Sequence, residues 1–155
     1  MAAVRFRCTN VEAIQNYYKL LKTTLTEHNF SGEPWRIYNV DETGMPLDPR
    51  KPRVVTKVGT KKVRVIGSGN KQQITVVACA SATGHIIPPM VIFEGKNLRR
   101  EWLNNEVTGT VYAMSDKGWI NTPLFNEWFD HFLRHAAPHR PLLLLLDGHS
   151  THLLT

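Results

Sequence analysis

Cysteine and long apolar runs are both scarce in this chain of 155 residues. Its two cysteines, Cys8 and Cys79, cannot form the disulfide framework of small secreted domains, so we expect a reducing compartment. The longest purely aliphatic run, Leu142 to Leu146, is far shorter than the roughly 20 apolar residues of a membrane helix, so we expect no membrane partner. A hydrophobic content of 42% still supports a core, and the length suits one domain.

Acidic residues are absent from the whole stretch between Asp48 and Glu94. The same stretch carries eight basic residues, so its charge exceeds the net charge of +6 of the entire chain. A long segment of one sign favours a polyanionic partner such as DNA, because Lys and Arg neutralise phosphates. The alternative is a solvated basic ribbon that only keeps the protein soluble. The candidate DNA-binding residues are Arg50, Lys51, Arg53, Lys57, Lys61, Lys62, Arg64 and Lys71.

The first half of the chain predicts a helix followed by strands. A helix is expected over 9–29, because Thr9 and Glu12 fit a capping box and apolar residues recur on one face. The segment 35–41 predicts a strand that ends at an aspartate. Alternating polar and β-branched residues over 54–66 then predict an exposed β-ribbon.

The second half predicts a hairpin, a short strand, a helix and a last strand. Apolar runs at 74–82 and 85–93 flank a turn, and Pro88-Pro89 should bulge or interrupt the second of them. After a short strand over 110–114, Thr122-Pro123 predicts a helix start, since Pro suits the first helical position. The leucines at 142–146 predict a strand buried on both faces, as in a central parallel strand.

Two of the predicted strands end in an aspartate followed by a turn. The first is Asp41, after Ile37 to Val40, and the second is Asp147, after the leucine run. Carboxylates at strand ends suit divalent ions, because hard cations prefer oxygen ligands. For one such aspartate alone, a turn or helix cap is the more common role.

The combined pattern resembles the DDE superfamily endonucleases of the pogo, Tigger and Jerky type. These are transposases and transposase-derived proteins, including centromere-protein-B-like ones. Residues 37–44, Ile-Tyr-Asn-Val-Asp-Glu-Thr-Gly, resemble the first catalytic motif of that family, and residues 145–152, Leu-Leu-Asp-Gly-His-Ser-Thr-His, resemble the second. Further segments match in the same order, namely the basic ribbon at 57–61, the hairpin at 74–84, the segment 88–96, Gly118-Trp119 and Trp128.

The resemblance implies an α/β fold, an RNase H-like mixed sheet with helix cover. In that fold the first strand opens an antiparallel meander, and a helix returns the chain to a strand parallel to the first. We expect an N-terminal helical lead-in at 1–34 and a partial DDE catalytic core at 35–155. The third acid of the Asp-Asp-Asp/Glu triad is expected on a helix beyond the second motif, so the chain is expected to be truncated at its C-terminus.

The resemblance also implies the chemistry. Asp41 and Asp147 are the expected catalytic residues and metal ligands, holding Mg²⁺ or Mn²⁺ for phosphodiester cleavage. DNA is the expected partner, the nucleus the expected location, and a homo-oligomer the candidate assembly. With only two of three acids encoded, we do not expect this chain alone to cleave DNA. The alternative function is a non-catalytic, domesticated DNA- or protein-binding domain.

Several residues near these motifs have two interpretations each. Glu42 should point away from Asp41 if the strand continues, which favours a structural role. His149 and His152 invite a zinc site, but two histidines without further partners are more often polar turn groups. Trp119 and Trp128 are expected in the core, with base stacking as the alternative.

Overall fold

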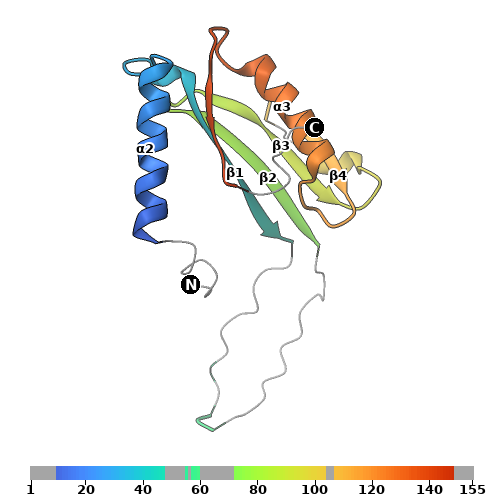
Figure 1. Ribbon diagram of the computed structural model, residues 1–155. Helices are drawn as coiled ribbons and strands as arrows, with labels where there is room; N and C mark the ends of the chain where they lie inside the picture. Colours follow the sequence, from blue (N-terminus) through green and yellow to red (C-terminus); the bar gives the residue numbers. More distant parts are fainter. Residues whose placement is uncertain (1–9, 48–54, 56, 60–71, 104–106, 149–155) are drawn as a thin grey trace.

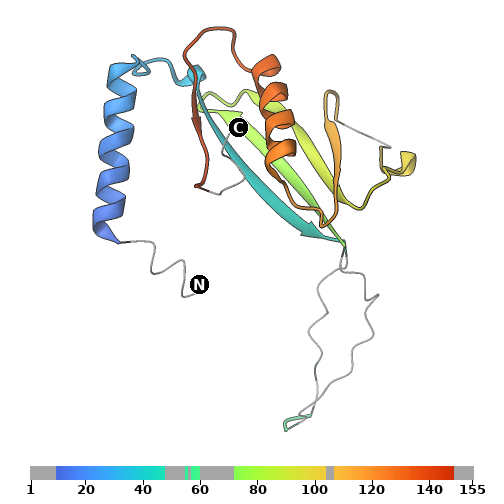
Figure 2. The same ribbon diagram turned by 45° about the vertical axis from the view of Figure 1, so that its right-hand side comes forward.

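The computed structural model describes residues 10–47, 55, 57–59, 72–103 and 107–148. In these residues a mixed five-stranded sheet carries one helix across one face, while a second helix stands apart from the sheet (Figures 1 and 2). The elements in chain order are α2 (Val11–Glu27), η1 (Pro34–Arg36), β1 (Ile37–Pro46), β2 (Gln73–Ser81), β3 (Ile86–Glu94), η2 (Arg100–Leu103), β4 (Val111–Ser115), α3 (Thr122–His135) and β5 (Leu143–Leu145).

The sheet has the strand order β4-β3-β2-β1-β5. Strands β1, β2 and β3 pair antiparallel, and β5 returns parallel to β1 after α3. This is the arrangement that the RNase H-like resemblance implies, and it confirms the predicted mixed α/β sheet with helix cover. The short strand predicted at 110–114 is β4, which adds an outer strand parallel to β3.

Helix α3 supplies the cover of the sheet. Its N-cap is Asn121, whose side chain accepts a hydrogen bond from the Leu124 backbone N–H at 3.0 Å. The helix starts at Thr122 as predicted, but Pro123 is its second residue and not its first. The helix buries Phe125, Trp128 and Phe132 against the sheet. The matching face of the sheet is apolar, so one core forms from Tyr38, Val40, Val77, Cys79, Ile87, Met90, Ile92, Ala113 and the buried residues of α3.

The predicted hairpin is β2 and β3, and its bulge lies at the two prolines. The register passes from Val77 opposite Met90 to Cys79 opposite Ile87, so Pro88 and Pro89 together face the single residue between Val77 and Cys79. An extra residue on one strand is the mark of a β-bulge. The bulge turns the Pro88 carbonyl towards α3, where it lies 2.8 Å from Nε2 of the buried His131.

Strand β1 does not end at Asp41, as was predicted. It continues to Pro46 and stays paired with β2 over its whole length beyond Asp41. The sequence Thr43-Gly44 suggested a turn, but ladder hydrogen bonds use only the backbone, and the long partner strand keeps both residues in extended pairing. Asp41 therefore lies within a strand and not at its tip.

Strand β5 also differs from its prediction. It lies at the edge of the sheet, and its three residues are only half-buried, while the following Leu146 is 38% exposed. A run of leucines indicates burial but contains no signal for the place of the strand in the sheet. The prediction of a central strand buried on both faces is wrong.

Helix α2 begins two residues later than the predicted range and packs little. Its cap is Asn10, whose side chain accepts from the Ala13 N–H at 2.6 Å, so the predicted capping box from Thr9 is wrong. None of its residues is buried, and Val11 at its start is 71% exposed. No helix among the described residues is long and apolar enough to cross a membrane.

Candidate metal centre

The alternation of strand β1 places Asp41 on the face of the sheet opposite α3. Tyr38 and Val40 point into the core, so Asn39 and Asp41 point the other way and are exposed. One carboxylate oxygen of Asp41, Oδ1, accepts a hydrogen bond from the Glu42 backbone N–H at 2.9 Å. Glu42, the next residue of the strand, points to the opposite face from Asp41, as predicted, and is partly buried.

The register of β1 and β5 bears on the two predicted metal ligands. Ile37 pairs with Leu143 and Asn39 with Leu145, so the two strands run side by side in the same direction. Asp41 lies four residues beyond Ile37, and Asp147 lies four residues beyond Leu143. Both aspartates are exposed, and each follows the last β1–β5 pair, Asn39 with Leu145, by two residues.

The approach of the two strands towards the acids is reinforced by a side chain. Asn39 donates a hydrogen bond from Nδ2 to the Leu145 carbonyl at 3.1 Å, across the β1–β5 pair. This contact lies two residues before Asp41 on one strand and two residues before Asp147 on the other. Because the donor is a side chain, it adds to the backbone ladder of the edge strand.

Asp41 borders an open hollow of about 480 Å³ on the same face of the sheet. Its floor has the small side chains Ala78 and Ala80 of β2, which lie opposite Asp41 and Asn39 in the ladder. Ile86 and Pro89 of β3 form the far side. The hollow therefore leaves room next to the carboxylate, where larger residues on β2 would fill the space.

The donor set at this place consists of carboxylates. Among the residues that the structure describes, no group of three His, Cys, Asp or Glu side chains could hold a metal ion. Burial raises the pKa of the Cys79 thiol to about 12, so this neighbour of the hollow stays protonated and is no thiolate ligand. Two exposed carboxylates fit a hard ion such as Mg²⁺ or Mn²⁺, which can keep water on its remaining positions.

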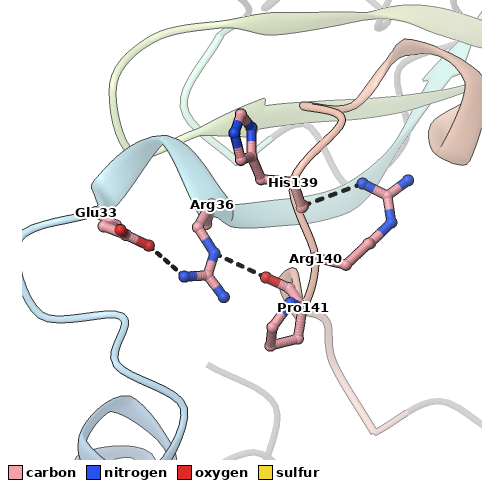
Figure 3. A network of polar contacts seen from close by, with 5 residues as sticks. All are labelled: Glu33, Arg36, His139, Arg140 and Pro141. Atoms are coloured by element: carbon pink, nitrogen blue, oxygen red, sulfur yellow. Dashed lines mark hydrogen bonds and ion pairs between the residues drawn. The ribbon is translucent and has the colours of Figure 1, made fainter.

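A polar network holds the chain segments that lead into β1 and β5. Arg36, which is buried, pairs with Glu33 through its guanidinium and donates from Nε to the Pro141 carbonyl at 2.8 Å (Figure 3). The same guanidinium lies over the Phe30 ring, 4.7 Å from its centroid. Next to it, the rings of Trp35 and His139 meet edge to face with centroids 5.0 Å apart.

Gly118 and Trp119, just before α3, pack closely on the sheet. Gly118 adopts a positive φ of 69°, and a Cβ there would come 2.9 Å from the Gln73 carbonyl oxygen, so only glycine fits. The following Trp119 lies over Gly44, where a Cβ would come 3.3 Å from its ring. Trp119 is 53% exposed and not the core residue that was predicted, whereas Trp128 is fully buried as expected.

Most of the predicted DNA-binding residues fall outside the part of the chain that the structure describes. They are Arg50, Lys51, Arg53, Lys61, Lys62, Arg64 and Lys71, and His149 and His152 lie outside it as well. Lys57 is described and is exposed, next to a turn at 58–59. The ends of β1 and β2 from which this segment leaves are joined by a hydrogen bond from the Leu47 N–H to the Gln72 carbonyl at 2.9 Å.

Two residues of the site had been missed in the sequence. Asn39 could have been found, because strand alternation places it on the same face as Asp41. Arg36 had no such signal, since a basic residue before a strand is usually exposed and its partners, Glu33 and Pro141, come together only in the fold.

Comparison with known proteins gives one family and several relatives. A family model described as DDE superfamily endonuclease matches residues 71–155, which include Asp147 and strands β2 to β5. The Jerky protein of Mus musculus is 29% identical over 149 residues, covering 90% of this chain and 26% of that protein. A match of that extent necessarily includes Asp41.

Two further relatives match over shorter segments. The Jerky protein homolog of Homo sapiens is 27% identical over 124 residues, which is 77% of this chain and 20% of that protein. A protein named MFS-type transporter clz9, from Cochliobolus lunatus, is 26% identical over 122 residues, 75% of this chain and 13% of that protein. The chain thus spans about a quarter or less of each relative's length. No solved structure matches it.

Proposed function

Because the chain belongs to the DDE superfamily endonucleases, we propose that it is a transposase-derived domain that binds a divalent metal ion and DNA. Asp41 and Asp147 are the proposed metal ligands. The observation that supports this most is the register of β1 and β5, because the last pair, Asn39 with Leu145, stands two residues before each exposed carboxylate and a continuation of both strands would set the acids side by side. The hollow beside Asp41 supports it further, since it leaves room for an ion with its waters.

The chemistry of the site follows from these donors. A bound Mg²⁺ or Mn²⁺ supplies a positive charge that can attract a phosphate oxygen and lower the pKa of water. The side chains of Asp41 and Asp147 would hold the ion by their carboxylate oxygens. The hydrogen bond from Asn39 to Leu145 keeps the two strands together just before both acids.

Cleavage is a further step that these two acids do not supply by themselves. The resemblance implies a third carboxylate, and the described residues contain no cluster of three potential ligands. We therefore propose weak metal binding by Asp41 and Asp147, and we place catalysis only in a chain in which a third acid joins them. The family's endonuclease activity is in this sense a proposal for the complete site.

The metal proposal is tested by titrating Mn²⁺ into the protein in a calorimeter. Asp41→Asn and Asp147→Asn should each abolish the binding heat, because one carboxylate cannot hold the ion against water. Asp130→Asn is the matched control, since Asp130 is an exposed acid on α3 and lies on the opposite face of the sheet from the acids. Equal Mn²⁺ affinity in the Asp41→Asn variant would show that the ion binds elsewhere.

The basic segment is proposed to bind the DNA backbone without reading bases, which also suits a nuclear protein. Replacing Lys62 and Arg64 by Ala should weaken binding to two unrelated duplexes alike and lower the salt slope by roughly one unit per lost contact. Lys19→Ala with Lys22→Ala on α2 removes the same charge at a different place and serves as the control. If the wild-type protein shows no salt-dependent DNA binding, the basic segment is only a solvated surface.

Helix α2 favours a second candidate function, a non-catalytic domain that binds protein. Its apolar residues recur at alternating spacings of three and four, as in one seam of a coiled coil, and they are Val11, Ile14, Tyr18, Leu21 and Leu25. We propose that this lead-in, within 1–34, pairs weakly with α2 of a second copy. Sedimentation at increasing concentration should show dimers that Tyr18→Glu removes, and a monomer at all concentrations would refute this pairing.

A further inference from the structure

The leucine run of β5 does not define its own alignment with β1. Residues 142–146 are all leucine, so a shift along β1 by one residue would keep leucine at every ladder position, and a shift by two would exchange only one of them for Pro141 or Asp147. Strand register is normally fixed by which side chains fit which face. That signal is missing here, and the ladder itself covers only three residue pairs.

The alignment nevertheless decides whether the two acids meet. A shift by two residues would move Asp147 about 6.6 Å along β1, since a strand rises about 3.3 Å per residue. That displacement exceeds the separation at which two carboxylates share one ion. A shift by one residue would turn Asp147 to the other face of the sheet.

The contacts that can distinguish these alignments lie before the leucines. Arg36 donates to the carbonyl of Pro141 (Figure 3), and Trp35 packs edge to face on His139. Pro141 and His139 are not repeated in the leucine run, so a shifted chain would have no equivalent for the ring contact. Arg36 is buried and forms an ion pair with Glu33, so its side chain is held in one conformation.

One contact lies at the far end of the short ladder. The Asn39 side chain bonds the Leu145 carbonyl at 3.1 Å. Neighbouring carbonyls of a strand point to opposite sides, so a shift by one residue would remove this acceptor. A shift by two would present another carbonyl, and Asn39 cannot exclude it.

We infer that Arg36 and Trp35, acting on Pro141 and His139, are positioning residues that fix β5 in the register in which Asp41 and Asp147 face each other. Asn39 excludes the shifts by one residue, and the contacts before the ladder exclude the shifts by two. The inference concerns the alignment of two strands, and its functional consequence rests on the proposed metal site.

The register can be measured without any metal by disulfide trapping in a Cys8→Ser background. Ile37→Cys with Leu143→Cys reports the observed alignment, because adjacent strands lie about 4.8 Å apart, within disulfide reach. Ile37→Cys with Leu145→Cys reports a shift by two, since in the observed register these positions are about 8 Å apart and cannot be bridged. Buried Cys79 remains in both reporters.

The test variant combines Arg36→Met with His139→Ala, and His139→Ala alone is the milder form because His139 is exposed. The ratio of shifted to observed cross-link should rise about fivefold or more, which is the change expected for losing one hydrogen bond. In Arg36→Lys the ratio should lie between those of the wild-type protein and of Arg36→Met, because an ammonium can still donate a hydrogen bond to the Pro141 carbonyl. Arg134→Met, on the exposed side of α3, removes the same kind of residue and should leave the ratio unchanged.

An unchanged ratio in a folded Arg36→Met and His139→Ala variant would overturn the inference. A shifted ratio supports it, and Mn²⁺ affinity should then fall in proportion to the fraction of molecules that leave the observed register, although Asp41 and Asp147 are intact. If the wild-type protein binds no Mn²⁺, the proposed metal function fails, while the cross-links still decide the register. If His139→Ala alone moves the ratio in the same direction, the shift in the double variant cannot be attributed to a loss of folding.

Discussion

The stability of this domain should depend on pH through one histidine, His131. This residue of α3 is only 2% exposed where the helix meets the bulge of β3, and its Nε2 lies 2.8 Å from the Pro88 carbonyl. Burial lowers the pKa of His131 below its ordinary value of 6.5, and the charges of His135 and Arg134 act in the same direction, against the bond to Pro88. In the folded protein His131 is therefore neutral and carries its proton on Nε2, from which it donates to the Pro88 carbonyl.

The sign of the effect follows from which state takes up the proton first. Between pH 6.5 and the lower folded pKa, the unfolded chain binds a proton on this ring and the folded chain does not. The free energy of unfolding should consequently fall as the pH drops below 6.5, and it should be insensitive to this group above that value. Urea unfolding at several pH values between 5 and 8 measures this.

Two variants separate the hydrogen bond from the titration. His131→Leu cannot donate, so the Pro88 carbonyl is left unsatisfied at a cost of about 1–3 kcal/mol, or a fall in Tm of roughly 3–10 °C. His131→Gln places an amide donor near the Nε2 position and cannot titrate. It should recover part of the stability and lose the acid sensitivity. His135→Gln controls for the neighbouring exposed ring.

The reasoning fails if His131→Gln unfolds with the same pH dependence as the wild-type protein, because the sensitive group would then lie elsewhere. It also fails if His131→Leu is as stable as His131→Gln at pH 8. The first result would refute the titration argument and the second the hydrogen bond.

The remaining predictions concern the site and its surroundings. With a Kd of about 1 mM for two carboxylates, 10 mM Mn²⁺ should stabilise the protein by about 1.4 kcal/mol and raise Tm by about 3–6 °C, and Asp41→Asn should remove the rise in a thermal scan. Gly118→Ala should lower the free energy of unfolding by about 2 kcal/mol or more, because its φ is 69° and a Cβ would meet the Gln73 carbonyl; unchanged stability in urea would contradict this. In a Cys8→Ser background, Cys79 should not react with a thiol reagent at pH 8 until the protein unfolds, since burial raises its pKa to about 12; fast reaction of the folded protein would show that the thiol is accessible.

Local signals in the sequence predicted the elements that depend on local chemistry. The start of α3 follows from Pro123 after a capping residue, and the hairpin with its bulge follows from Pro88-Pro89 between apolar runs. The order of these elements, with the resemblance, predicted that β5 would return parallel to β1. The helix start and the hairpin are determined by residues that are close together in the sequence.

The errors arose where distant partners decide the outcome. Gly44 belongs to a strand because β2 extends beside it, and Trp119 is at the surface because it lies over that glycine. The leucine run indicated burial, but an edge place in the sheet is a property of the topology. The face of α2 is amphipathic in sequence, yet the described fold gives it no burial. The positions of Asp41 and Asp147 in the chain were sufficient to propose them as a pair, while the contacts that align them were visible only in three dimensions.

The unequal lengths of the two ladders on β1 give the candidate site one rigid and one labile half. Asp41 lies on a strand paired with β2 from Tyr38 to Pro46, whereas Asp147 follows a strand paired over three residues only. Short edge pairings open at a small free-energy cost, so the amides of β5 should exchange with solvent faster than those of β1. An ion that needs both acids binds only while β5 is docked, and its apparent affinity is reduced by the docked fraction. Whatever next packs on this edge strand, even without touching the ion, would therefore raise the affinity of the site.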